Sequence, residues 1–176
     1  ESEYKKDEND RIHFLNTANS DCILIESNGH FALIDSGEGD RNPRRKTAYK
    51  GYEKEVLSFI KKRAIDKNGN VKLDFILATH YHYDHDGNFE TIISDKDIQI
   101  GKAYMKPYSP ETATSTERTA WGNEKTYEAI ISALKKRRIP IESELPAEEF
   151  TFGDFTLKFL NTRTPEELAG KGENAN

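Results

Sequence analysis

Cysteine is almost absent from this sequence, which holds one cysteine among its 176 residues. A single cysteine can form neither an internal disulfide nor a multi-cysteine zinc site, so both are excluded. Cys22 lies in the apolar run of residues 22–25. We therefore expect a buried thiol with a structural role at this position.

Long apolar runs are absent as well, and no stretch is long enough to span a bilayer. Residues 1–10 are charged and lack the apolar middle of a signal peptide, which leaves open a cytosolic start or an end trimmed after export. The net charge of −5 argues against a nucleic-acid binder. We expect no membrane span and no nucleic-acid partner.

The sequence does contain a regular succession of strand and helix signals. Asn28-Gly29 joins two apolar runs and is typical of a tight β-hairpin. Residues 73–79 are apolar almost without alternation, as in a strand covered on both faces. The order of these signals predicts a mixed α/β fold. Expected strands cover residues 12–16, 21–27, 30–35, 73–79 and 102–106, a second hairpin covers 150–161, and expected helices lie at 52–60, 88–94 and 124–138.

Four potential metal ligands lie within six residues at the carboxyl end of the expected strand 73–79. His80 and His82 are two apart in an extended segment, so their side chains can reach one metal ion from the same side. Asp84 and His85 follow and can face a second ion close by. Imidazole and carboxylate are ligands that zinc favours. Closely spaced histidines, by contrast, do not contribute to a hydrophobic core. The alternative is an exposed polar loop.

The motif His80-x-His82-x-Asp84-His85 after a buried strand resembles the signature of the metallo-β-lactamase superfamily. Residues 34–37, with Asp35, resemble the first motif of that superfamily. The resemblance implies a four-layer αββα sandwich with two zinc ions. Residues 1–176 would form one domain of this fold, incomplete at its carboxyl end, with the N-terminal half and part of the rest. Asp35 would orient a ligand imidazole, and Asp84 would both bind metal and hold the attacking water.

Weaker matches over most of the chain resemble one branch, the phosphorylcholine esterases of bacterial choline-binding surface proteins. This branch implies an aromatic surround for a quaternary ammonium group, with Trp121, Tyr104 and Tyr108 as candidates, although each could equally pack in the core. It also favours a secreted or cell-surface location. Tyr81 and Tyr83 depart from the smaller residues expected of the branch, so we expect them to reshape the mouth of the pocket. The matching segments are residues 10–14, 26–29, 73–88, 104–106, 108–109, 117–118, 121 and 152–154.

The larger departure is the scarcity of later ligands, because no histidine follows His85. His13 and His30 have no other ligand types beside them, and we expect structural or surface roles for both. Asp154 falls in a hairpin turn and is not a convincing bridging ligand. The chain is thus expected to be either a fragment, with the missing half on a separate chain or in a further segment, or a degenerate relative. An uncovered sheet face is costly, so the fragment is favoured.

The expected activity is that of a metal-dependent hydrolase in which a metal-bound hydroxide attacks a phosphodiester, such as a phosphorylcholine ester. The substrate would be a small molecule or a cell-surface group. The expected helix near Asn88 would turn its positive end toward an anionic group. Two alternatives stay open: another hydrolase of the fold (lactamase, lactonase or nuclease), and a non-catalytic binding domain.

Overall fold

A computed structural model describes residues 10–44, 50–111 and 113–160. Its largest unit is a six-stranded sheet in the order β1-β2-β3-β5-β7-β8. The first two pairings are antiparallel, and the three between β3, β5, β7 and β8 are parallel. The sheet strands are β1 (Arg11–Phe14), β2 (Ile23–Ser27), β3 (His30–Ile34), β5 (Phe75–Leu77), β7 (Ala103–Tyr104) and β8 (Ile141–Glu142). The mixed α/β prediction is confirmed.

The predicted hairpin at Asn28-Gly29 is confirmed, with Ser27 paired to His30. Asn28 and Gly29 take φ angles of 46° and 78°, a left-handed conformation that these two residue types tolerate. The second predicted hairpin is formed by β9 (Phe150–Phe152) and β10 (Phe155–Leu157). Residues 162–176 lie outside the described part of the chain.

The strand predicted over residues 73–79 is wrong in its extent, because the chain forms two short strands there. β4 (Val71–Leu73) pairs with β6 (Ile98–Ile100), whereas β5 enters the main sheet between β3 and β7. Asp74 lies at the break, where its carboxylate accepts hydrogen bonds from His30 Nδ1 and from the backbone N–H of Phe31. All three residues of β5 are buried, as a strand covered on both faces should be.

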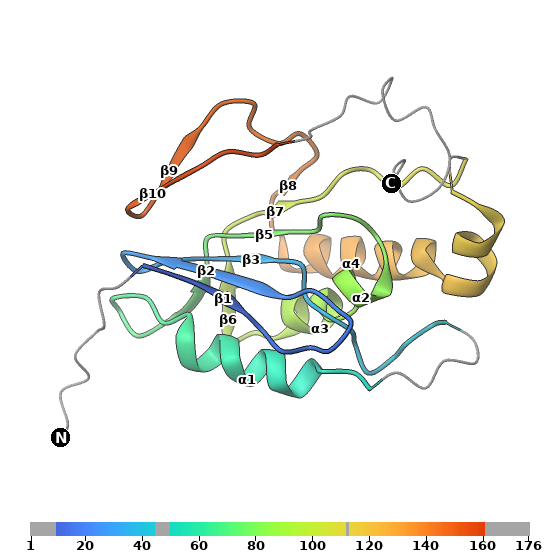
Figure 1. Cartoon of the computed structure of the whole chain (residues 1–176), viewed down its shortest axis with the longest axis horizontal. Helices are drawn as coiled ribbons and strands as arrows, with labels where there is room; N and C mark the ends of the chain where they lie inside the picture. The colour runs from blue at the N-terminus through green and yellow to red at the C-terminus, as the bar shows by residue number, and fades with distance from the viewer. Residues whose placement is uncertain (1–9, 45–49, 112, 161–176) are drawn as a thin grey trace.

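The helices lie together on one face of the sheet, and the β9–β10 hairpin lies on the other (Figure 1). On the helical face, Val56, Ile60, Phe89, Ile130 and Leu134 pack with sheet residues in the main core. The apolar stripes predicted for the two longer helices are thus confirmed. The helices are α1 (Glu53–Arg63), α2 (Tyr83–Asp86), α3 (Phe89–Ser94), α4 (Asn123–Arg137) and the π-helix η1 (Glu117–Trp121).

A second apolar cluster fills the opposite face of the sheet around Phe75, Tyr104 and Phe152. Of the four layers expected, the described residues therefore provide one helical layer and one sheet, with a hairpin on the far face. Cys22 is buried in the main core, as predicted, and burial raises the pKa of its thiol to about 12. Within the described residues, no helix has the length and apolar character needed to cross a membrane.

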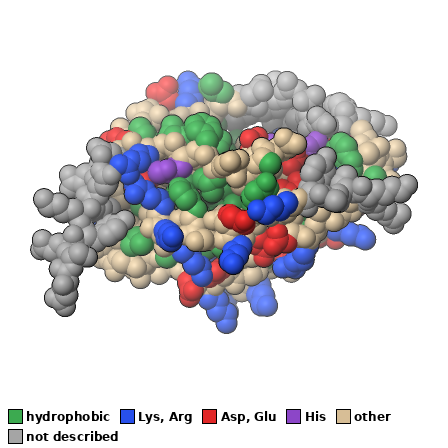
Figure 2. Space-filling model, turned by 60° about the horizontal axis from the view of Figure 1, so that its bottom comes forward, with side chains coloured by type: hydrophobic (Ala, Val, Ile, Leu, Met, Phe, Trp, Pro, Cys, Tyr) green, Lys and Arg blue, Asp and Glu red, His purple; other side chains and the backbone are tan. Residues whose placement is uncertain are grey.

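The surface over α1 carries basic and acidic side chains side by side (Figure 2). Lys61 at the end of α1 lies 2.7 Å from Asp95 and 3.0 Å from Asp97. Arg137 at the end of α4 donates to the carbonyl oxygens of Ile93, Asp95 and Ile98 and so ties α3 and β6 to that helix. These basic residues hold surface elements together.

Two large apolar side chains of β1 stay exposed on the far face of the sheet. Ile12 is 53% exposed and Phe14 is 76% exposed. Their partners in register, Ile25 and Ile23, are only partly buried, although Leu24 between them is fully buried on the helical face. Within the described residues, the β1 end of this face thus lacks the cover that the hairpin gives to its other end.

This asymmetry predicts very different responses to truncation on the two faces. Phe14→Thr should change the free energy of unfolding by less than about 0.5 kcal/mol, because its ring loses little contact in the folded chain. Leu24→Ala should cost about 2–5 kcal/mol, because it opens a cavity in the core. Urea unfolding of residues 1–176 measures both values. Equal losses would show that the β1 face is packed in solution.

Candidate metal centre

The histidine motif lies where β5 ends and the chain turns into α2. Beside it, β3 ends at Ile34, and the backbone N–H of the next residue, Asp35, donates to the Leu77 carbonyl at 2.9 Å. The backbone N–H of Ser36 donates to the carbonyl of His85 at 2.6 Å. Because β3 and β5 are parallel neighbours, their carboxyl ends meet at one edge of the sheet and bring both segments together.

The three imidazoles of the motif are gathered at this edge. The ring centroid of His80 lies 4.7 Å from that of His82 and 4.0 Å from that of His85. The other two histidines lie apart from them in separate contacts, His13 with Glu26 and His30 with Asp74. The structure thus separates a cluster of three histidines from two structural ones.

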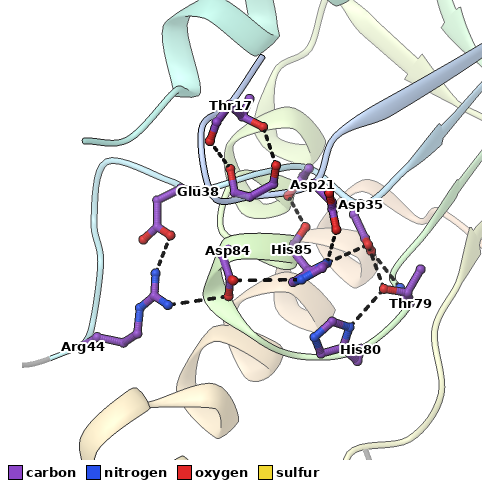
Figure 3. Close-up of polar contacts among 11 residues, drawn as sticks. Thr17, Asp21, Asp35, Glu38, Arg44, Thr79, His80, Asp84 and His85 are labelled. Carbon is purple, nitrogen blue, oxygen red and sulfur yellow. Dashed lines mark hydrogen bonds and ion pairs between the residues drawn. The ribbon is translucent and has the colours of Figure 1, made fainter. Parts of the chain in front are cut away.

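Asp35 positions two members of the cluster, His85 directly and His80 through Thr79 (Figure 3). Its Oδ1 accepts from the backbone N–H of Thr79 at 2.8 Å, and its Oδ2 accepts from Thr79 Oγ1 at 2.7 Å and from His85 Nδ1 at 2.9 Å. Since the one hydroxyl proton of Thr79 goes to Asp35, Thr79 Oγ1 accepts from Nδ1 of His80, 3.0 Å away. Both rings therefore use Nδ1 for positioning and keep Nε2 for another partner.

Burial and mutual repulsion set the charge of the cluster. Burial, with the nearby His85 and His82, lowers the pKa of His80 to about 4, so this ring is neutral at neutral pH. Burial also lowers the pKa of His85, but the hydrogen bond and charge of Asp35, with Asp84 and Asp21, outweigh it and leave the pKa raised. The cluster thus offers at least one neutral nitrogen lone pair without any change in protonation.

Asp84 completes the motif at the edge of the cluster. Its Oδ2 lies 3.9 Å from Nε2 of His85, and its Oδ1 lies 3.5 Å from Nη1 of Arg44. Beside it is a pocket of about 130 Å³, lined among others by Thr17, Ser20 and Tyr52. The carboxylate therefore lies between the imidazoles and a hollow that opens to solvent.

The donor set fits a divalent metal by its chemistry. Nε2 of His82 is buried without a hydrogen-bond partner, a costly state that a ligated ion would relieve. In the described part of the chain, no group of three or more His, Cys, Asp or Glu side chains is arranged, as it stands, to hold a metal ion. The residues that would hold it are nevertheless His80, His82, Asp84 and His85, which present nitrogen and oxygen donors at one place.

Sequence reasoning missed a carboxylate beside the cluster. Glu117 is buried, with Oε1 at 3.8 Å from Nε2 of His82 and Oε2 accepting from the backbone N–H of Thr114 at 2.6 Å. It begins η1, and single π-turns of this kind often occur at functional sites. Glu117 had appeared only in one of the weak branch matches, which gave no sign of its contact with His82.

The sequence matches a known protein family over most of its length. The family model described as the metallo-beta-lactamase superfamily matches residues 15–171. The chain belongs to the metallo-β-lactamase superfamily. No curated protein matches the sequence. The phosphorylcholine esterase branch is not singled out by any of these comparisons.

Two solved structures are similar to part of the chain. The hydrolase AbOPH in the beta lactamase superfamily is 19% identical, with a TM-score of 0.45. AidC, a dizinc quorum-quenching lactonase in complex with a product, is 13% identical, with a TM-score of 0.40. In both cases the match covers 70% of this chain and 42% of the other. The chain thus spans less than half the length of these structures.

The three aromatic candidates of this superfamily member lie in different places. The Trp121 ring meets the His82 ring edge-on, with centroids 4.9 Å apart, and is only half-buried. Tyr104 is buried on the far face of the sheet against Phe75 and Phe159. Tyr108 packs its ring near Tyr81. Only Trp121 therefore contacts the histidine cluster.

The expectation that Tyr81 and Tyr83 shape the pocket mouth is wrong, because both are buried. His80 and His82 point one way from the extended segment, so Tyr81 between them points the other way, into the protein, whereas Tyr83 is buried as the first residue of α2. Tyr81 donates to the carbonyl of Lys106 and packs against Tyr127 at 4.9 Å between centroids. The two tyrosines fix the motif from inside.

The helix predicted near Asn88 is present as α3. The backbone N–H of Asn88 donates to Ser36 Oγ, and its side chain donates to the carbonyls of Ser36 and Glu38. Asn88 is fully buried. These contacts fasten the helix start to the loop after β3, and the contact with an anionic group expected there stays a prediction.

The buried position of Tyr81 predicts a stability effect inside the metal motif. Tyr81→Ala should cost about 3–5 kcal/mol in the free energy of unfolding, because it empties a packed ring site. Tyr81→Phe should cost about 1 kcal/mol, because only the hydrogen bond to the Lys106 carbonyl is lost. Denaturant unfolding of metal-free protein measures both. Unchanged stability in Tyr81→Ala would show that the ring is not packed inside the protein, and it would support a position at the pocket mouth.

Proposed function

We propose that this chain carries the metal-binding edge of a metal-dependent hydrolase, with His80, His82, Asp84 and His85 as ligands. The observation that carries the proposal is the fixed orientation of the imidazoles. Nδ1 of His80 and of His85 is engaged by Thr79 and Asp35, and Nε2 of His82 is buried without a partner. A set of rings held in this way is suited to a cation that takes the remaining nitrogens.

Zinc bound at this edge would act as a Lewis acid and lower the pKa of a water molecule toward neutrality. Asp84, with Oδ2 directed toward the imidazoles, would accept a hydrogen bond from the attacking water and keep it in place. Asp35 would maintain the orientation of His85 through its bond to Nδ1. No histidine follows His85, so the full-length protein is the right material for every assay of activity.

The ligand assignment predicts metal binding that depends on the clustered histidines and on Asp35, and not on the distant His30. Full-length protein should contain about two zinc ions by elemental analysis. His82→Ala should reduce this content, and Asp35→Ala should weaken zinc affinity by about 10–100-fold. His30→Ala is the matched control, since this histidine bonds to Asp74 instead. A wild-type protein that contains no zinc would refute the assignment. An equal loss of zinc in His30→Ala would refute it too.

For the substrate we propose a phosphodiester, with phosphorylcholine esters as the first compounds to test. Support comes from the sequence resemblance to the esterase branch and from the half-buried Trp121 ring beside His82. An indole next to a metal edge offers a π face to a quaternary ammonium group. Glu117 and Asp84 add negative charge near the same place, which also favours a cationic headgroup.

This proposal predicts a selective effect of the Trp121 ring. Full-length protein should hydrolyse p-nitrophenyl phosphorylcholine and bis-p-nitrophenyl phosphate, but not a β-lactam or a lactone. Trp121→Ala should reduce kcat/KM for the choline ester by about 10-fold, close to the 1–2 kcal/mol of a cation–π contact. Trp121→Phe keeps an aromatic face and should retain most of that selectivity.

Several outcomes would change the assignment. Turnover of only the lactam or the lactone would overturn the phosphodiester proposal. An equal loss on both diesters in Trp121→Ala would give the ring a packing role. Bound zinc without turnover of any of the four compounds would favour the alternative of a non-catalytic binding domain.

A further inference from the structure

We propose that Arg44 is a positioning residue for Asp84, an inference that rests on the metal-dependent function proposed above. The two oxygens of Asp84 face different partners: Oδ1 lies 3.5 Å from Nη1 of Arg44, and Oδ2 lies 3.9 Å from Nε2 of His85. Figure 3 shows the guanidinium between Glu38 and Asp84, on the side away from the histidines. Arg44 contacts Oδ1 of Asp84 and leaves Oδ2 directed toward the proposed metal ligand His85.

The guanidinium of Arg44 is itself fixed by contacts with Glu38 and Asn42. Its Nη2 donates to the buried carboxylate of Glu38, and its Nε donates to Asn42 Oδ1 at 3.2 Å. The backbone N–H of Arg44 donates to the same Asn42 oxygen at 2.8 Å. The side chain of Arg44 is only 18% exposed. A forked cation with several fixed contacts can hold a carboxylate in one rotamer.

The loop that carries this arrangement is fastened to the metal motif by other contacts. Asn88 donates to the carbonyl of Glu38, and Ser36 bonds to the backbone of His85. At Gly39 a side chain would collide with the carbonyl of Gly87, so the two segments lie backbone to backbone. Arg44 therefore reaches Asp84 from a support that is fixed relative to the motif, as the positioning of a ligand requires.

The experiment compares the zinc affinity of full-length variants by competition with a chromophoric chelator. Arg44→Ala should weaken zinc binding by about 10–100-fold, the usual effect of removing a group that orients a ligand. Arg44→Lys keeps the charge but reaches only one carboxylate, and it should lose about 3–10-fold. Arg41→Ala is the matched control: this arginine of the same loop is 70% exposed and faces Glu90, so affinity should not change.

A double-mutant cycle shows whether Arg44 acts through Asp84. In an Asp84→Asn background, Arg44→Ala should cause no further loss of affinity, because the group it positions is already gone. A full further loss would mean that Arg44 acts on the fold, and this would overturn the inference. Tighter or unchanged zinc binding in the single variant Arg44→Ala would overturn it too, the former by showing that Arg44 competes with metal for Asp84.

Crystal structures of metal-free wild type and Arg44→Ala supply a readout that needs no zinc. The Asp84 side chain should keep Oδ2 toward His85 in the wild type and turn away from it in the variant. An unmoved Asp84 would contradict the inference. If the wild type bound no zinc at all, the proposed function would fail, and these two structures alone would decide the role of Arg44.

Discussion

The Asp35 carboxylate is the contact on which the metal edge depends. It receives the backbone N–H and hydroxyl of Thr79 and the Nδ1 proton of His85, so it joins the end of β3 to both ends of the motif. Asp35 takes a φ of 53°, a left-handed conformation that is unfavourable for most side chains and tolerated by aspartate. The backbone turns sharply there, and the carboxylate comes to lie beside Thr79 and the ring of His85. Strain at such a position persists only where the surroundings fix it, as the backbone bond of Asp35 to Leu77 and the three hydrogen bonds accepted by its carboxylate do.

The parts of the structure that the sequence predicted depend on local rules. The turn at Asn28-Gly29 follows from two residues that tolerate positive φ, and the helix now bounded by Asn123 and Arg137 follows from an apolar stripe at helical spacing. The histidine cluster follows from the two-residue repeat of an extended segment placed at a strand end. In each case the residues that decide the outcome are neighbours in sequence. The superfamily match over residues 15–171 then explains why these local features occur in this order.

The features that escaped prediction depend on partners distant in sequence. Asp74 interrupts an apolar run because His30 and Phe31 bond to its carboxylate, and no pattern within residues 71–79 announces this. Tyr81, expected at the pocket mouth, is buried instead. The two-residue repeat that gathers His80 and His82 on one side already implies that Tyr81 faces inward. Glu117 could not have been found in the same way, since its contact with His82 crosses 35 positions and depends on a π-turn. Side-chain direction was predictable, whereas tertiary pairing was not.

His80 and His85 differ in the partners of their Nδ1 atoms. Nδ1 of His85 is bonded to the Asp35 carboxylate, whereas Nδ1 of His80 reaches only the hydroxyl of Thr79. Burial, with the nearby His85 and His82, lowers the pKa of His80 to about 4, whereas the hydrogen bond and charge of Asp35, with Asp84 and Asp21, outweigh burial and raise the pKa of His85. A carboxylate that accepts the Nδ1 proton of an imidazole increases the basicity of the other ring nitrogen. Of these two rings, His85 therefore has the more basic Nε2, so the proposed nitrogen ligands are not equivalent.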